Sequence, residues 1–161
     1  MAYNDVYTGL SGSVAVAATT ATIVCSVFGT AAKRTWVVGV RVKIGVTLAA
    51  AGNDVRFQLA RPGNTPNASS TSGGSAHDFS SPASVGQFAT AYTVAPTVGT
   101  ILAEWMLPQT TGSAWTEFPP TGDEWGVPAI ANNNANAGLH LFAIPTVNTS
   151  TPMFVDLIWG E

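Results

Sequence analysis

The sequence predicts an all-β protein, an antiparallel β-sandwich of about eight to ten strands. Short runs of alternating apolar residues recur along the chain, and turn residues separate them about every 8–12 residues. The clearest run, Trp36–Leu48, has a large apolar residue at every even position. Side chains alternate between the two faces of a strand, whereas a helix would scatter these residues around its circumference. No segment shows a convincing amphipathic helix pattern.

In the first half of the chain, four segments carry this strand pattern. They are Ser11–Ala18, Thr20–Phe28, Trp36–Leu48 and Asp54–Arg61. The first two are expected to form a hairpin around Ala18–Thr20. In the fourth segment Val55, Phe57 and Leu59 should point inward, because they alternate with polar or small residues.

Six further strands are expected in the second half, each bounded by Gly, Pro or Asn turns. They are Gln87–Val94, Thr100–Leu107, Trp115–Phe118, Glu124–Ala131, Gly138–Ile144 and Met153–Trp159. Eight strands in two packed sheets form the jelly-roll arrangement, so the predicted sandwich is jelly-roll-like.

The length of 161 residues suits one domain with a sizeable core. We expect a single domain over residues 11–161, interrupted by a long loop at 62–86 that is rich in Ser, Gly and Pro. Residues 1–10 form a polar arm, either a short first strand or an extension lying on a neighbour. This arm lacks the features of a signal peptide, and no apolar run reaches the ~18 residues of a membrane span.

Charge is scarce and unevenly distributed. Only 9% of residues are charged, against a typical ~25%, and the net charge is −3. All six basic residues precede position 62, whereas seven of the nine acidic residues follow it. Either the fold neutralises these charges within one molecule, or a positive patch meets a negative patch on a neighbour. So few cations in an acidic chain argue against a nucleic-acid partner.

No catalytic or metal-binding pattern is present, and we expect neither an enzyme nor a cofactor. His77 and His140 lie far apart and give no metal-ligand spacing. Asp123 and Glu124 flank a loop but lack the ligand spacing of a calcium site. Cys25 is the only cysteine and lies in an apolar strand, which raises a thiol pKa.

Five tryptophans leave a sugar-binding function open. Trp36, Trp105 and Trp159 fall on apolar strand faces and should pack in the core. Trp115 and Trp125 lie near the turn Pro119–Asp123, where they could be exposed and stack on a glycan. This alternative is a carbohydrate-binding jelly-roll module.

Several segments together resemble small virion proteins of tailed bacteriophages, in particular capsid decoration (cement) proteins and related jelly-roll structural proteins. The resemblance is one of style across most of the chain, and no motif in it is diagnostic. It is carried by Trp36–Leu48 with Val55–Arg61, Phe118–Val127, Gly138–Ile144 and Phe154–Glu161. It implies a protein that binds the outside of a phage capsid and stabilises it, commonly as a homotrimer. The implied partner is the major capsid protein, on virions assembled in the host cytoplasm, with no membrane partner. A phage tail or baseplate component is the alternative location.

The candidate assembly contacts come from three parts of the chain. If Asp54–Arg61 pairs with the long strand, Arg41, Lys43 and Arg56 share one outer face that could dock on an acidic shell, although they could equally be solvated. Tyr3 and Tyr7 in the arm, and Phe79 in the long loop, are the candidates to reach neighbouring subunits.

Overall fold

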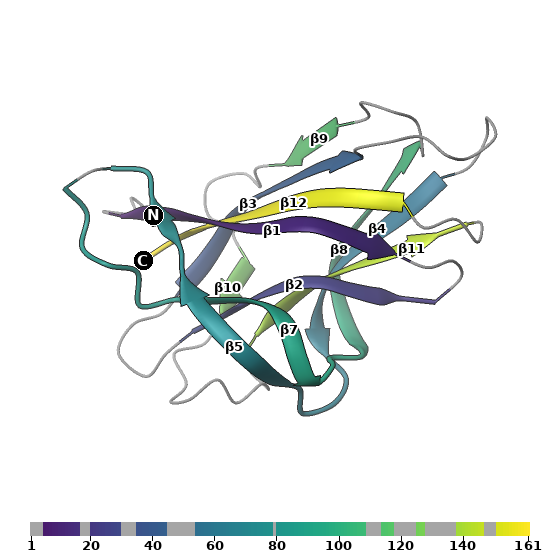
Figure 1. Ribbon diagram of the computed structural model, residues 1–161, viewed down its shortest axis with the longest axis horizontal. Helices are drawn as coiled ribbons and strands as arrows, with labels where there is room; N and C mark the ends of the chain where they lie inside the picture. Colours follow the sequence, from purple (N-terminus) through teal and green to yellow (C-terminus); the bar gives the residue numbers. More distant parts are fainter. Residues whose placement is uncertain are drawn as a thin grey trace.

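A computed structural model of the chain describes residues 5–16, 20–29, 35–44, 54–78, 80–108, 114–117, 125–127, 138–146 and 151–161. These residues form twelve strands and no helix, and the strands make two antiparallel sheets of six strands each. Sheet A contains β1 (Val6–Val16), β3 (Thr35–Ile44), β6 (Ser75–Ala76), β9 (Ala114–Glu117), β10 (Trp125–Val127) and β12 (Thr151–Gly160). Sheet B contains β2 (Thr22–Phe28), β4 (Asp54–Pro62), β5 (Asn67–Gly73), β7 (Gln87–Val94), β8 (Val98–Pro108) and β11 (Leu139–Pro145). The predicted antiparallel sandwich is therefore confirmed (Figure 1).

The strand pairs are nested. The first strand of the chain pairs with the last strand, and the next pairs lie between these two in the sequence. β1 pairs with β12, β2 with β11, β3 with β9 and β10, and β4 with β8. The β12–β3 pair then completes sheet A, and the β11–β4 pair joins the two halves of sheet B. This nested hairpin, wrapped so that the first four strands alternate between the two sheets, is the jelly-roll connectivity expected from the sequence. Nine of the strands are seven residues or longer, while β6, β9 and β10 have only two to four.

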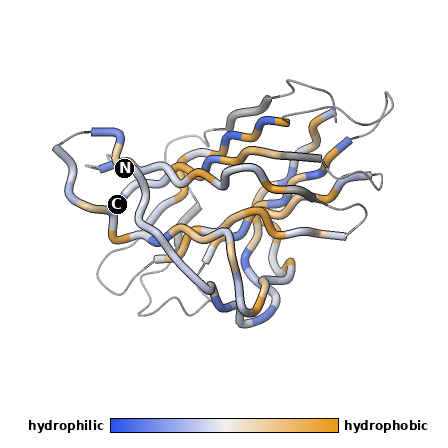
Figure 2. The backbone as a smooth tube through the Cα atoms, in the orientation of Figure 1, coloured by the Kyte–Doolittle hydropathy of each residue, from blue (hydrophilic) through white to orange (hydrophobic). Residues whose placement is uncertain are grey.

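The core lies between the sheets and is built from alternate residues of each strand. In β4, Val55, Phe57 and Leu59 are fully buried, as their alternation predicts. Opposite them, β3 and β12 contribute a matching set of buried side chains. These are Val40, Val42, Ile44, Met153, Val155, Leu157 and Trp159. Figure 2 shows hydrophobic residues recurring along the strands of both layers, whereas β5 is pale along its length. Burying each large side chain contributes about 1.5–3 kcal/mol before entropy is subtracted.

Within β3, the side chains that point into the core change from odd-numbered to even-numbered positions, which corrects one prediction. Ile158 of β12 pairs with Gly39, but the next residue, Trp159, pairs with Val37, so Val38 has no residue opposite it. This bulge shifts the alternation by one residue. Even positions point inward from Val40 onward, whereas the odd positions 35 and 37 are the buried ones before it. The prediction that Trp36 and Val38 face the core is wrong, since both are partly exposed. Positions 46 and 48 lie outside the described residues.

Two predicted pairings between consecutive strands are also wrong. β1 and β2 belong to different sheets, so they form no hairpin around Ala18–Thr20. β3 and β4 are likewise separated, because β4 pairs with β8 and β11. Jelly-roll wrapping sends each successive strand of the first four to the opposite layer, which removes the local pairings that short turns suggested.

The predicted arm and loop both contain strands. β1 begins at Val6 and pairs along its length with β12, so residues 6–10 form a first strand, which is one of the two alternatives expected for the arm. The region 62–86 contains β5 and β6, although its sequence is almost free of bulky apolar residues. β5 extends sheet B beyond β7, and β6 adds two residues to the edge of β1. The insertion therefore covers parts of the β1 and β7 edges, which would otherwise offer unpaired backbone groups to another chain.

Hydrogen bonds to Glu161 hold the segment 80–86 against the C-terminal end of β12. The Glu161 carboxylate accepts hydrogen bonds from the Ser84 hydroxyl (2.7 Å) and from the backbone N–H groups of Gly86 (2.6 Å) and Val85 (3.1 Å). The indole N–H of Trp159 donates to the same carboxylate at 3.2 Å. Trp159 lies fully buried beneath this segment and stacks with Phe88 at 6.3 Å between ring centroids. One carboxylate thus joins the insertion to the C-terminal strand.

We expect Glu161→Ala to lower the free energy of unfolding by about 1–3 kcal/mol, because several donors lose their charged acceptor at once. Urea unfolding of the variant measures this loss. Hydrogen exchange at the Val85 and Gly86 amides should also accelerate. Asp78→Ala is the matched control, since that carboxylate is exposed and accepts only local bonds from Ser80. Equal stability losses in the two variants would contradict the role given to Glu161.

Candidate docking face

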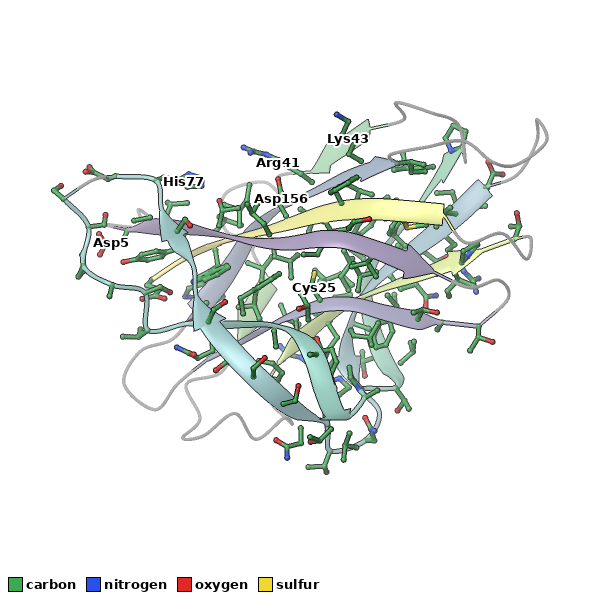
Figure 3. The ribbon with its side chains drawn as sticks, in the orientation of Figure 1. Asp5, Cys25, Arg41, Lys43, His77 and Asp156 are labelled. Carbon is green, nitrogen blue, oxygen red and sulfur yellow. The ribbon has the colours of Figure 1, made fainter. Side chains whose placement is uncertain are left out.

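Arg41 and Lys43 lie on the outer face of sheet A, as predicted, and both are exposed. They are two residues apart on β3, so their side chains leave the strand on the same side, opposite to the core residues Val40 and Val42. Figure 3 shows both side chains pointing away from the sandwich. Across the sheet, Arg41 pairs with Asp156 and Lys43 pairs with Phe154.

Arg56 is not part of this face, and the prediction that the three cations share one face is wrong. Arg56 belongs to β4 in sheet B, and its Nε lies 3.9 Å from a carboxylate oxygen of Glu104 on β8. Both side chains are more than 40% exposed, so solvent screens this pair strongly. Along with Met106, Ile144, Pro145 and Thr146, the two line an open groove of about 350 Å³.

Two large apolar side chains accompany the cations on sheet A, and neither was predicted from the sequence to be a contact residue. Leu10 is 63% exposed and pairs with Asp156, while Phe154 is 43% exposed and pairs with Lys43. We use the term mixed face for the outward side chains of two neighbouring cross-strand rows. They are Leu10, Asp156 and Arg41 in one row, and Ser13, Phe154 and Lys43 in the other.

On the mixed face, the two cations are more exposed to solvent than the carboxylate is. Arg41 and Lys43 are exposed, whereas Asp156 is partly buried between its neighbours. Burial raises the pKa of the Asp156 carboxyl above its ordinary value, and the charge of Arg41 offsets part of this rise. The mixed face therefore presents positive charge and apolar surface to solvent, with its one carboxylate set back.

The remaining predicted assembly contacts are not on this face. Tyr7 is fully buried, stacks on Trp159 and donates its hydroxyl hydrogen to the Pro82 carbonyl at 2.8 Å. It belongs to the core, so the prediction that it reaches a neighbouring subunit is wrong. Tyr3 and Phe79 lie outside the described residues. The structure describes only the backbone of Trp115 and Trp125, which pair with Val42 and Val37 of β3.

A buried polar chain on sheet B is the group closest to a catalytic arrangement. The Ser26 hydroxyl lies 2.6 Å from His140 Nδ1 and 2.5 Å from the Tyr92 hydroxyl, which donates to the Ala89 carbonyl at 3.0 Å. Because Tyr92 uses its hydrogen on a carbonyl, Ser26 must donate to Tyr92, and His140 Nδ1–H must donate to Ser26. The network thus assigns the Nδ1–H tautomer and leaves His140 Nε2 without a hydrogen-bond partner.

Burial favours the uncharged forms of the side chains in and beside this hydrogen-bonded network. Burial lowers the pKa of His140 to about 3, because a proton on Nε2 would place an uncompensated charge in the interior. Burial likewise raises the pKa of Tyr92 and of the Cys25 thiol. Ser26 and His140 are fully buried, and neither lines the groove beside Arg56 or the smaller cavity of about 150 Å³ beside Leu10.

Over the part of the chain that the structure describes, no three His, Cys, Asp or Glu side chains gather as a metal site would require. The same residues include no helix of the length and apolarity needed to cross a membrane. Comparison with protein-family models, curated proteins and solved structures finds no match to this chain. A proposal about function must therefore start from the chain's own surface.

The two histidines provide a matched test of the buried network. His140 has a folded pKa near 3, below its ordinary value of 6.5, so the unfolded chain binds a proton that the folded chain refuses. The contribution of neutral His140 to the free energy of unfolding is complete above pH 6.5 and declines toward pH 3, by up to ~1.4 kcal/mol per pH unit. Urea unfolding between pH 7.5 and 5 should show this decline in the unsubstituted chain and in His77→Gln, whose histidine is exposed. The decline should be smaller in His140→Gln, and an unchanged slope in that variant would refute this account.

Proposed function

We propose that this chain is a virion structural protein that binds the outside of a tailed-phage capsid and stabilises it. The observation that carries the proposal is the mixed face, an open sheet surface where Leu10 and Phe154 remain exposed beside two cations. Exposed apolar side chains that gather next to polar groups are typical of surfaces that bind another protein. The proposed partner is the major capsid protein, and assembly takes place in the host cytoplasm.

The architecture and the composition support the same function. Jelly rolls are a common architecture of viral capsid domains, although a fold alone does not fix a function. A chain with only 9% charged residues has weak electrostatic protection against association, which suits a protein that acts within an assembly. We propose a non-enzymatic role, since the Ser26–His140 pair and the Cys25 thiol are all buried.

We propose that the protein acts as a homo-oligomer of three copies. Several copies joined around a symmetry axis bind a shell through several weak contacts at once, which raises the overall affinity without any new contact. The location on the head, rather than on the tail or baseplate, is part of the proposal and is tested below by copy number.

The test uses the purified chain and empty shells of the virus that encodes it. Sedimentation should show saturable binding at micromolar concentration, and decorated particles should release DNA at a higher temperature than bare ones. Light scattering should give a mass of three chains, 3 × 16.6 kDa. A monomer that ignores shells at micromolar concentration would remove the proposal. A low copy number in purified virions would assign the chain to the tail instead, which also contradicts decoration.

A further inference from the structure

The mixed face differs in kind from the other exposed apolar sites on the described surface. Val94, Ile101 and Met106 are also exposed, but they lie on sheet B. Beside Met106, Arg56 is a single cation and lies 3.9 Å from the Glu104 carboxylate. On sheet A, the two exposed cations Arg41 and Lys43 lie beside Phe154, and Asp156 is partly buried. Among the described residues, the mixed face is therefore the one surface that places two exposed cations beside large exposed apolar side chains.

We propose that the mixed face is the surface that contacts the shell, and that the shell surface it fits is acidic and contains an apolar hollow. This inference rests on the proposed function. Arg41 and Lys43 on β3 face carboxylates of the partner, while Leu10 and Phe154 on the neighbouring strands enter the adjacent hollow. The spacing follows from the sheet, since strands lie about 4.8 Å apart and outward residues of one strand about 6.7 Å apart.

The two kinds of side chain have separable roles in this contact. Exposed cations steer an encounter over a distance of about one Debye length and mainly accelerate association. Leu10 and Phe154 supply affinity, because their exposed surface leaves water only when the contact forms. Salt should therefore weaken the contribution of Arg41 and Lys43 and leave that of the apolar pair.

The size of the face explains why several copies must act together. Three strands and two rows span roughly 14 by 13 Å, or about 190 Å², which is about a quarter of the ~800 Å² that each partner buries in a stable complex. One copy alone is then a weak binder. Several linked copies would reach stable attachment through effective concentration.

The chemistry favours a protein over nucleic acid as the partner. DNA-binding surfaces neutralise several phosphates and are strongly basic. The mixed face has two cations and a carboxylate, and it places Leu10 and Phe154 where a phosphate backbone would offer no apolar contact. Affinity for a short DNA duplex serves as the opposing outcome in the test.

The experiment compares charge-matched double variants in the shell-binding assay. Arg41→Ala with Lys43→Ala removes two positive charges from sheet A, and Arg56→Ala with Arg61→Ala removes two from sheet B. We expect the sheet A variant to lose about tenfold in affinity at low salt, and the sheet B variant to lose less than about threefold. The loss in the sheet A variant should shrink as salt rises.

A second pair of variants tests the apolar anchors. Leu10→Ser with Phe154→Ser should reduce shell affinity at least about tenfold at both low and high salt. Ile101→Ser with Met106→Ser is the control, because it removes two comparably exposed apolar side chains from sheet B. Urea unfolding of all four variants confirms that each remains folded.

The outcomes separate this inference from the proposed function. If the unsubstituted chain binds shells and both sheet A variants bind equally well, the inference fails while the proposed function stands. If the unsubstituted chain does not bind shells, both fail. A sheet A variant that changes the oligomer mass without shells would make the face a contact between copies, and tight binding to the DNA duplex would make it a nucleic-acid surface. Either result overturns the inference.

Discussion

The antiparallel pairing of the first strand with the last is the interaction on which the rest of the structure depends. β1 and β12 run side by side from Val6↔Gly160 to Val16↔Thr151, and each further pair is nested inside this one. These two strands come from opposite ends of the chain, and the first four strands alternate between the two sheets. The pairing therefore decides which residues share a face, where the edges lie, and which side chains the solvent meets.

Properties that depend only on neighbouring residues could be predicted from the sequence, and properties that depend on a distant partner could not. Val55, Phe57 and Leu59 were correctly placed inward, because alternation within β4 is unbroken at these positions. The phase switch at Val38 escaped prediction, since the bulge exists only in relation to Ile158 and Trp159 on β12. β5 was missed for a related reason. Its three serines and one threonine carry no apolar pattern, and its strand conformation follows from pairing with β7.

The candidate site shows the same division. Arg41 and Lys43 were placed on an outer face by alternation alone, but Arg56 was assigned to them through a pairing of β3 with β4 that the jelly roll does not make. Phe154 did leave a signal, because it alternates with Met153 and Val155 and so had to point outward. Leu10 left none. It follows polar residues, and only its pairing with Asp156 across the sheet reveals the face it shares.

Because successive side chains of a strand point to opposite faces, one face can stabilise the core while the other remains available for binding. In β12, Met153, Val155 and Leu157 fill the core, while Phe154 and Asp156 between them face outward. Substitutions on the mixed face therefore remove little of the burial that stabilises the fold, whereas a helix of the same length would distribute its contacts around a full turn. Leu10 and Phe154 contribute little to the core in their exposed positions, so their surface remains available to a partner. This separation is what allows binding to be tested independently of folding.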